Sequence, residues 1–114
     1  MNDSDEVRLH HMLDAARDAI IFTTGRQRNE LATDRMLTLS LVKCIEIIGE
    51  AAARVSDGTC GRYPEIPWQN IISMRHRLIH AYYDVNLDIV WQTVIEDLPP
   101  LIASLEKVLG LIAG

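Results

Sequence analysis

The sequence predicts an all-α fold, an up-and-down bundle of four main helices with a short fifth helix, formed as one domain by residues 1–114. Apolar residues recur every three or four positions through most of the chain, which is the spacing of helices with one buried face. The few glycines and prolines mostly lie between these periodic segments. Hydrophobic residues make up 48% and charged residues 24% of the sequence, as in a soluble globular domain with a single core.

The N-terminal half is expected to form two long helices. The first covers residues 5–24, with Ser4 as its N-cap and Gly25 just beyond its end, where glycine often adopts the left-handed conformation. The second runs from about residue 30 to residue 55. Its interior glycine, Gly49, costs about 1 kcal/mol relative to alanine, so we expect another helix to pack closely at that position.

The C-terminal half is expected to hold three more helices after an irregular connection over residues 57–67. The third helix starts at Pro67, because proline fits a first helical turn, and ends near Tyr83. Asn86 is the predicted N-cap of the fourth helix, and a proline pair separates that helix from the fifth. These last two helices are expected over residues 87–97 and 100–112.

Residues 74–85 are the segment in which charge and apolar pattern conflict. On a helix, Arg75 would fall near the middle of a broad apolar arc. Burying an arginine is unfavourable unless an anion or a hydrogen-bond acceptor satisfies it, so Arg75 either pairs with a carboxylate or faces a groove that receives an anion. Glu50 is the candidate carboxylate, and Glu46 is expected at a solvated edge. The arc would consist of Trp68, Ile71, Ile72, Met74, Leu78, Ile79, Tyr82 and Tyr83.

Charge and cysteine content restrict the class of protein. The formal net charge of −5 argues against non-specific coating of nucleic acid, which depends on neutralising phosphates. Residues 60–83 hold three arginines and one acid, so a nucleic-acid contact is expected at one small site. Cys44 and Cys60 lack metal-type spacing and are expected to be reduced thiols. Signal-peptide features and a membrane-spanning apolar run are lacking, which predicts a cytoplasmic protein without membrane contact.

Three interpretations of the segment around Arg75 are open from the residues alone. In the first, the chain cleaves RNA without a metal. His80, with a reference pKa of about 6.5, would move protons at the ribose and the leaving oxygen, and Arg75 would stabilise the phosphate. In the second, His76 and His80 are ligands of a zinc ion, although the adjacent arginines disfavour a cation. In the third, Arg75 only pairs with an acid and the histidines pack.

The spacing of Arg75 and His80 raises a geometric difficulty for RNA cleavage. Five positions on an ideal helix separate two side chains by about 140°, so one copy would not bring both to one phosphate. Either the helix unwinds near His80, or two subunits join their motifs across a shared groove. We favour the dimer, because two copies supply two histidines, one as base and one as acid.

The pattern Arg75-x4-His80-x-Tyr82 resembles the signature of the HepT-type HEPN domains, the toxin halves of bacterial HepT/MntA toxin–antitoxin pairs. The resemblance extends over nearly the whole chain and includes residues 45–51, 66–68 and 97–100. It implies a two-fold homodimer with a composite site at the interface, acting as a metal-independent endoribonuclease that needs no cofactor.

The resemblance also implies residue roles and a partner. Arg75 and His80 would be the catalytic residues. His76 and Arg77, which neighbour Arg75 in the sequence, are expected from their own chemistry to contact RNA phosphates. Tyr82 would be adenylylated by an MntA-like nucleotidyltransferase antitoxin, which uses ATP and silences the toxin. The alternative is a non-catalytic HEPN domain that only binds or scaffolds that nucleotidyltransferase.

Overall fold

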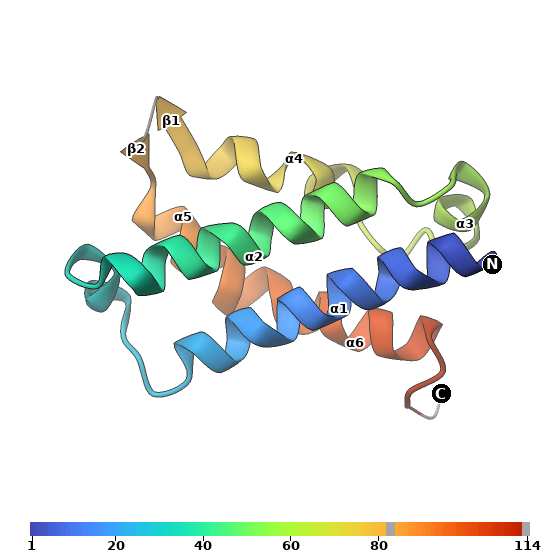
Figure 1. Ribbon diagram of the computed structural model, residues 1–114, viewed down its shortest axis with the longest axis horizontal. Coiled ribbons are helices and arrows are strands. Elements are labelled where there is room, and N and C mark those ends of the chain that lie inside the picture. The colour runs from blue at the N-terminus through green and yellow to red at the C-terminus, as the bar shows by residue number, and fades with distance from the viewer. Residues whose placement is uncertain (82–83, 113–114) are drawn as a thin grey trace.

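The computed structural model describes residues 1–81 and 84–112, and the side chains of residues 79–81 are outside this description. The main helices alternate in direction along the chain (Figure 1), which confirms the predicted all-α bundle. They are α1 (Asp3–Thr23), α2 (Arg35–Ala53), α4 (Trp68–Leu78), and the segment of α5 (Leu87–Gln92), the π-helix η2 (Thr93–Asp97) and α6 (Leu98–Val108). The short elements are the 3-10 helix η1 (Arg28–Ala32), α3 (Asp57–Arg62), β1 (Ile79–Ala81) and β2 (Asp84–Val85). Over the described part of the chain, no helix combines the length and apolar character needed to cross a membrane.

Helix α1 begins two residues earlier than predicted because Asn2, and not Ser4, is its cap. The Asn2 side chain accepts a hydrogen bond from the backbone N–H of Asp5 at 2.7 Å. Asn and Ser are nearly equal as caps, so the sequence alone does not choose between them. At the other end of the helix, Gly25 has φ of 74°, which confirms the predicted left-handed glycine.

The predicted helix over residues 30–55 is wrong at its start, because the chain breaks at Asp34 and forms η1 and α2 separately. The Asp34 side chain accepts a hydrogen bond from the N–H of Leu37 at 3.1 Å and caps α2, which requires the extended backbone observed at Asp34. Arg26 donates to the same carboxylate at 2.6 Å and pairs with Glu30 at 3.1 Å. The hydrogen bond from Arg26 holds the pKa of Asp34 below its usual range.

Part of the connection predicted to be irregular is the short helix α3, and a buried carboxylate holds its start. Asp5 of α1 accepts hydrogen bonds from the N–H of Ser56 at 3.0 Å, from the Ser56 hydroxyl, and from the Thr59 hydroxyl at 2.6 Å. Trp68 fixes the other end by donating its indole N–H to the carbonyl oxygens of Cys60 and Tyr63, both at 3.1 Å. These side-chain bonds, distant in sequence, supply the order that local periodicity did not predict.

The Asp5 carboxylate is expected to make stability depend on acid. Hydrogen bonds from Ser56 and then Thr59 hold the pKa of Asp5 below its usual value, so its ionised form stabilises the fold. This contribution is complete above the unfolded-chain pKa of about 3.9 and is lost as pH falls through the lower folded-state pKa. Melting curves between pH 7 and pH 3 should show a larger fall in Tm for the wild type than for Asp5→Asn. Asp3→Asn, at an exposed acid of the same turn, should behave as wild type, and parallel curves for all three proteins would contradict this role.

The fourth helix begins as predicted but does not end at the proline pair. The Asn86 side chain accepts a hydrogen bond from the N–H of Ile89 at 3.1 Å, which confirms the predicted cap. The helical path then continues through η2 into α6, and Leu98 donates its N–H to the carbonyl of Thr93, five residues back. Pro99 and Pro100 stand in the first turn of α6. The wider π turn before them makes room for rings that would clash with the carbonyls of an α turn.

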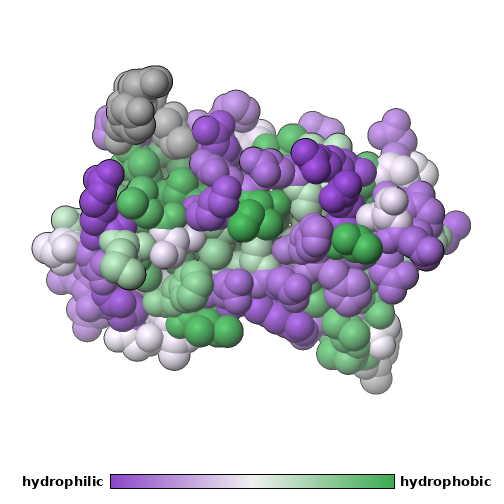
Figure 2. Space-filling model, in the orientation of Figure 1, coloured by the Kyte–Doolittle hydropathy of each residue, from purple (hydrophilic) through white to green (hydrophobic). Residues whose placement is uncertain are grey.

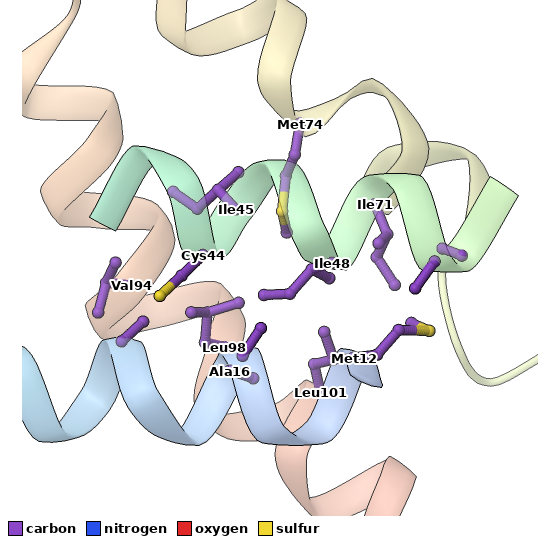
Figure 3. Packing of buried hydrophobic residues seen from close by; sticks show 14 of the residues in the cluster. Met12, Ala16, Cys44, Ile45, Ile48, Ile71, Met74, Val94, Leu98 and Leu101 are labelled. Carbon is purple, nitrogen blue, oxygen red and sulfur yellow. The ribbon is translucent and has the colours of Figure 1, made fainter. Parts of the chain in front are cut away.

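The core lies between α1, α2, α4 and the η2–α6 segment, and Figure 3 shows apolar side chains from all of these elements meeting. Helices α2 and α4 pack closely against each other at Gly49. A Cβ at this position would lie 3.3 Å from the carbonyl oxygen of Ile71 and 3.6 Å from that of Ile72. The predicted close helix contact at Gly49 is therefore confirmed, and it fixes how α4 is placed along α2.

The end of α1 and the start of α2 together expose an apolar patch, made of Ile21, Phe22, Met36 and Leu39. Hydrophobic side chains gather on this half of the face in Figure 2. Met36 is 81% exposed and Ile21 is 65% exposed. Exposed apolar patches of this kind commonly mark contacts with other proteins.

Candidate active site

Helix α4 ends at Leu78, five residues earlier than predicted, and the chain then forms a small antiparallel ribbon. Strand β1 pairs with β2 through Ile79 opposite Val85 and Ala81 opposite Asp84. The carbonyl of Leu78, at the end of the helix, accepts a hydrogen bond from the N–H of Asn86 at 2.6 Å, so this carbonyl is paired with the returning chain. The β-branched residues of this segment also favour strands over helices.

Because His80 belongs to β1, the angle calculated for two side chains on one helix does not apply to Arg75 and His80. The helix end removes the geometric difficulty that favoured a dimer, so the dimer is no longer needed to explain the spacing and stays a prediction. The His80 side chain lies outside the described atoms. Tyr82, the predicted modification site, also lies outside the described residues, as does Tyr83.

Arg75 is exposed and is held by Glu46, which corrects two predictions. Its Nε donates to Glu46 Oε1 at 3.1 Å, and its side chain is 51% exposed where burial was expected. The predicted partner, Glu50, is exposed one turn further along α2, where it lines a small hollow with Arg8 and Arg54. The contact at Gly49 explains why Arg75 pairs with Glu46. Because α2 and α4 are antiparallel and Gly49 lies against Ile72, Glu46, three residues before Gly49, lies opposite Arg75, three residues after Ile72.

The pairing leaves the outer half of the Arg75 guanidinium available. Glu46 receives Nε–H, and the two terminal nitrogens donate no hydrogen bond among the residues that the structure describes. A guanidinium presents several donors in a planar fork that matches phosphate geometry. Glu46 therefore orients the side chain while its phosphate-binding edge faces outward. Glu46 was missed as a site residue, and only the helix register could have identified it.

His76 and Arg77 do not lie with Arg75 on one surface. His76 is exposed and follows Arg75 by about 100° around the helix. Arg77 lies about 200° from Arg75 and folds back along α4, where its Nη2 donates to the carbonyl of Asn70 at 3.1 Å. Arg77 therefore points to the α6 side of α4, away from Glu46.

Among the side chains that the structure describes, metal ligands and reactive thiols are not gathered near Arg75. Within residues 1–81 and 84–112, as far as their side chains are described, no three His, Cys, Asp or Glu residues are placed to hold one metal ion. Cys44 is buried in the core, and burial raises the pKa of its thiol to about 11. Burial also raises the pKa of the half-buried Cys60. Both thiols are free, as predicted, and protonated at neutral pH.

Comparison with known proteins adds a consistent result. The family described as Ribonuclease HepT-like matches residues 12–108. A protein of Methanocaldococcus jannaschii named "Putative RNase" is 30% identical over 106 residues, which cover 93% of this chain and 88% of that protein. A second protein of the same organism, also described as "Putative RNase", is 31% identical over 100 residues, 88% of this chain and 92% of that protein.

A "Probable ribonuclease HepT" of Thermococcus cleftensis is 39% identical over 74 residues, 65% of this chain and 67% of that protein. No solved structure matches this chain significantly. The matches with the two archaeal proteins of M. jannaschii extend through the bundle and the motif segment, so the similarity concerns the whole domain and not one local pattern.

Proposed function

Because the chain belongs to the HepT-like ribonuclease family, we propose that it is the toxin of a toxin–antitoxin pair and cleaves RNA without a metal. Arg75 and His80 are its catalytic residues, and Tyr82 is the position at which an antitoxin silences it. The observation that carries the proposal is the arrangement of Arg75. Glu46 holds its Nε, its terminal nitrogens face outward, and the chain turns toward His80 three residues later, after Leu78.

The proposed reaction uses the ribose 2′-hydroxyl as the nucleophile. His80 takes the 2′-hydroxyl proton, the 2′-oxygen attacks the phosphorus, and the bond from phosphorus to the 5′-oxygen breaks. The products are a 2′,3′-cyclic phosphate and a 5′-hydroxyl, whose proton an imidazolium donates. Arg75 binds the phosphate through its terminal nitrogens and stabilises the charge that grows in the transition state. A requirement for the 2′-hydroxyl would make RNA, and not DNA, the substrate.

A homodimer forms part of this proposal. One chain brings one His80, whereas the reaction uses a base and an acid, and a second copy would supply the other imidazole. The apolar patch at Ile21, Phe22, Met36 and Leu39 supports association with another chain. The mass of the purified protein at micromolar concentration tests this step, since a monomer would leave a single histidine to perform both transfers.

Cleavage of mixed RNA in the presence of EDTA tests the proposed activity. Wild type expressed without its partner is expected to cleave, and His80→Ala is expected to be slower by about 100-fold or more, because it removes the general base and acid. Circular dichroism should show the same helix content for both proteins. Wild type that fails to cleave would favour the scaffold alternative, and cleavage lost only on addition of EDTA would favour a metal site.

Silencing through Tyr82 predicts a covalent change that mass spectrometry can detect. We expect co-expression with the neighbouring nucleotidyltransferase to add adenylate to the wild type and to stop RNA cleavage. The added phosphate would bring negative charge and volume to the motif that contains Arg75. Tyr82→Phe is expected to stay unmodified, and Tyr83→Phe, the matched control, should be modified as wild type. Adenylate persisting on Tyr82→Phe would show that this tyrosine is not the sole acceptor.

A further inference from the structure

A cavity of about 310 Å³ lies between α4 and α6, on the side of α4 opposite the Arg75–Glu46 pair. Its floor consists of core side chains: Ile71 is 1%, Met74 is 3% and Leu101 is 4% exposed. Figure 3 shows Ile71 and Met74 extending from α4 and Leu101 from α6. The volume is within the range of small-molecule sites, about 300–1,000 Å³.

Polar groups of both charges line the mouth of this cavity. Arg77 contributes a guanidinium from α4, Glu65 a carboxylate from the segment before α4, and Asp97 a carboxylate from the end of η2. Among the described residues, neither carboxylate makes an ion pair or accepts a hydrogen bond. Two unpaired carboxylates against one guanidinium disfavour a phosphate here. They suit an uncharged planar ligand that offers hydrogen-bond donors and acceptors together.

The π-helix η2 is the second feature of this cavity. Asp97 is the last residue of η2, and Pro100 of the following turn also lines the cavity. Single π turns inside α-helices are frequent at functional sites. The opposite wall includes Pro67, at the entrance to α4. Pro67, from the segment before α4, and Asp97 and Pro100, from the junction of η2 and α6, therefore meet at this cavity, together with Arg77 from within the motif.

We infer that this cavity binds one base of the RNA substrate and selects guanine. The inference rests on the proposed function and deepens it. Guanine offers two neighbouring acceptors, O6 and N7, which match arginine, and N–H donors on its Watson–Crick edge, which match a carboxylate. Arg77 and Asp97 supply these two groups over an apolar floor. Cytosine also carries two acceptors, but beside a single donor group. Guanine alone offers two adjacent N–H donors, on N1 and N2, for both oxygens of a carboxylate, together with a separate pair of acceptors.

The position of the cavity relative to Arg75 also indicates which nucleotide of the RNA would bind in it. Arg75 and Arg77 lie on opposite sides of α4, a helix about 10 Å across with its side chains. The guanine therefore belongs to a nucleotide close to the cleaved bond but not to the phosphate that Arg75 holds. His76 lies on the exposed ridge between the two sides, where the connecting RNA backbone crosses the helix.

Binding of nucleoside 5′-monophosphates to the full-length ¹⁵N-labelled protein tests the inference. We expect GMP to produce saturable shifts at amides around the cavity, including Ile71 and Leu101, and AMP, CMP and UMP to bind more weakly. Asp97→Asn should weaken GMP binding about tenfold. Glu96→Gln, which makes the same charge change one residue earlier in η2 and outside the cavity, should bind as wild type.

Three results would overturn the guanine site. They are no saturable shifts at the cavity with GMP, equal binding of all four nucleotides, or equal losses in Asp97→Asn and Glu96→Gln. The measurement involves no bond cleavage, so its outcome is separate from the proposed activity. GMP binding at this cavity without RNA cleavage would support the guanine site and contradict the nuclease activity. RNA cleavage without GMP binding would support the nuclease activity and contradict the guanine site.

Discussion

Arg75→Ala is expected to reduce the rate of RNA cleavage by about 100-fold or more, the usual effect of removing one donor that stabilises transition-state charge. The expected loss is large because, within the described part of the chain, the terminal nitrogens of Arg75 have no partner and Glu46 engages only Nε. This ion pair is half-exposed, so its loss should change stability by about 1 kcal/mol or less. Initial rates on a fluorescent RNA, measured beside thermal melting, separate the two effects.

Arg77→Ala is the matched comparison for Arg75→Ala, because it removes the same group two residues away from the opposite side of α4. We expect a much smaller loss of rate on mixed RNA, with the change concentrated at sites that carry guanine. Arg75→Lys should recover only part of the activity, since it keeps the charge but not the planar fork. Equal losses in Arg75→Ala and Arg77→Ala would contradict the separation of the two side chains.

Gly49→Leu is expected to destabilise the fold by about 3 kcal/mol, near the upper end of the usual cost of overpacking. A side chain at Gly49 meets backbone and not a movable side chain, since a Cβ would already lie 3.3 Å from the carbonyl oxygen of Ile71. Helix α4 would have to move outward along its contact with α2. Urea unfolding monitored by circular dichroism measures the change.

Gly58→Leu is the control for this substitution, because a Cβ at Gly58 in α3 meets nothing within 4 Å. It should cost much less than Gly49→Leu. Gly49→Leu should also lower RNA cleavage by the molecules that stay folded, because moving α4 separates Arg75 from Glu46. A Gly49→Leu protein as stable as Gly58→Leu would show that α2 and α4 tolerate a wider separation than their packing indicates.

The bundle could be predicted because its periodicity is local, whereas several boundaries could not. The break at Asp34 depends on Arg26, which binds both Asp34 and Glu30 across a turn. The helix α3 depends on Asp5, about fifty positions earlier in the chain. Periodicity within a window does not report such contacts, so the sequence indicated a continuous helix in the first case and an irregular segment in the second.

The sequence proposed residues for the candidate site but did not predict the contacts of Arg75. Glu50 and Glu46 are one turn apart on α2, and which of them meets Arg75 depends on how far α4 is shifted along α2. That shift is fixed by Gly49 against Ile71 and Ile72, which only the packed structure defines. The end of α4 at Leu78 likewise depends on a hydrogen bond from Asn86, eight residues later.

This closure between Leu78 and Asn86 has a consequence for how such a protein can be engineered and how it can diversify. A backbone hydrogen bond of 2.6 Å joins the two residues, so the segment between them begins and ends at neighbouring points of the bundle. Residues 79–85, which include His80, are therefore a loop-like insertion whose two ends are held together by the bundle. Sequences of the same span could be exchanged there if an apolar residue is kept at Val85, which packs against the core. The reactivity of the domain could then be altered while its scaffold is kept.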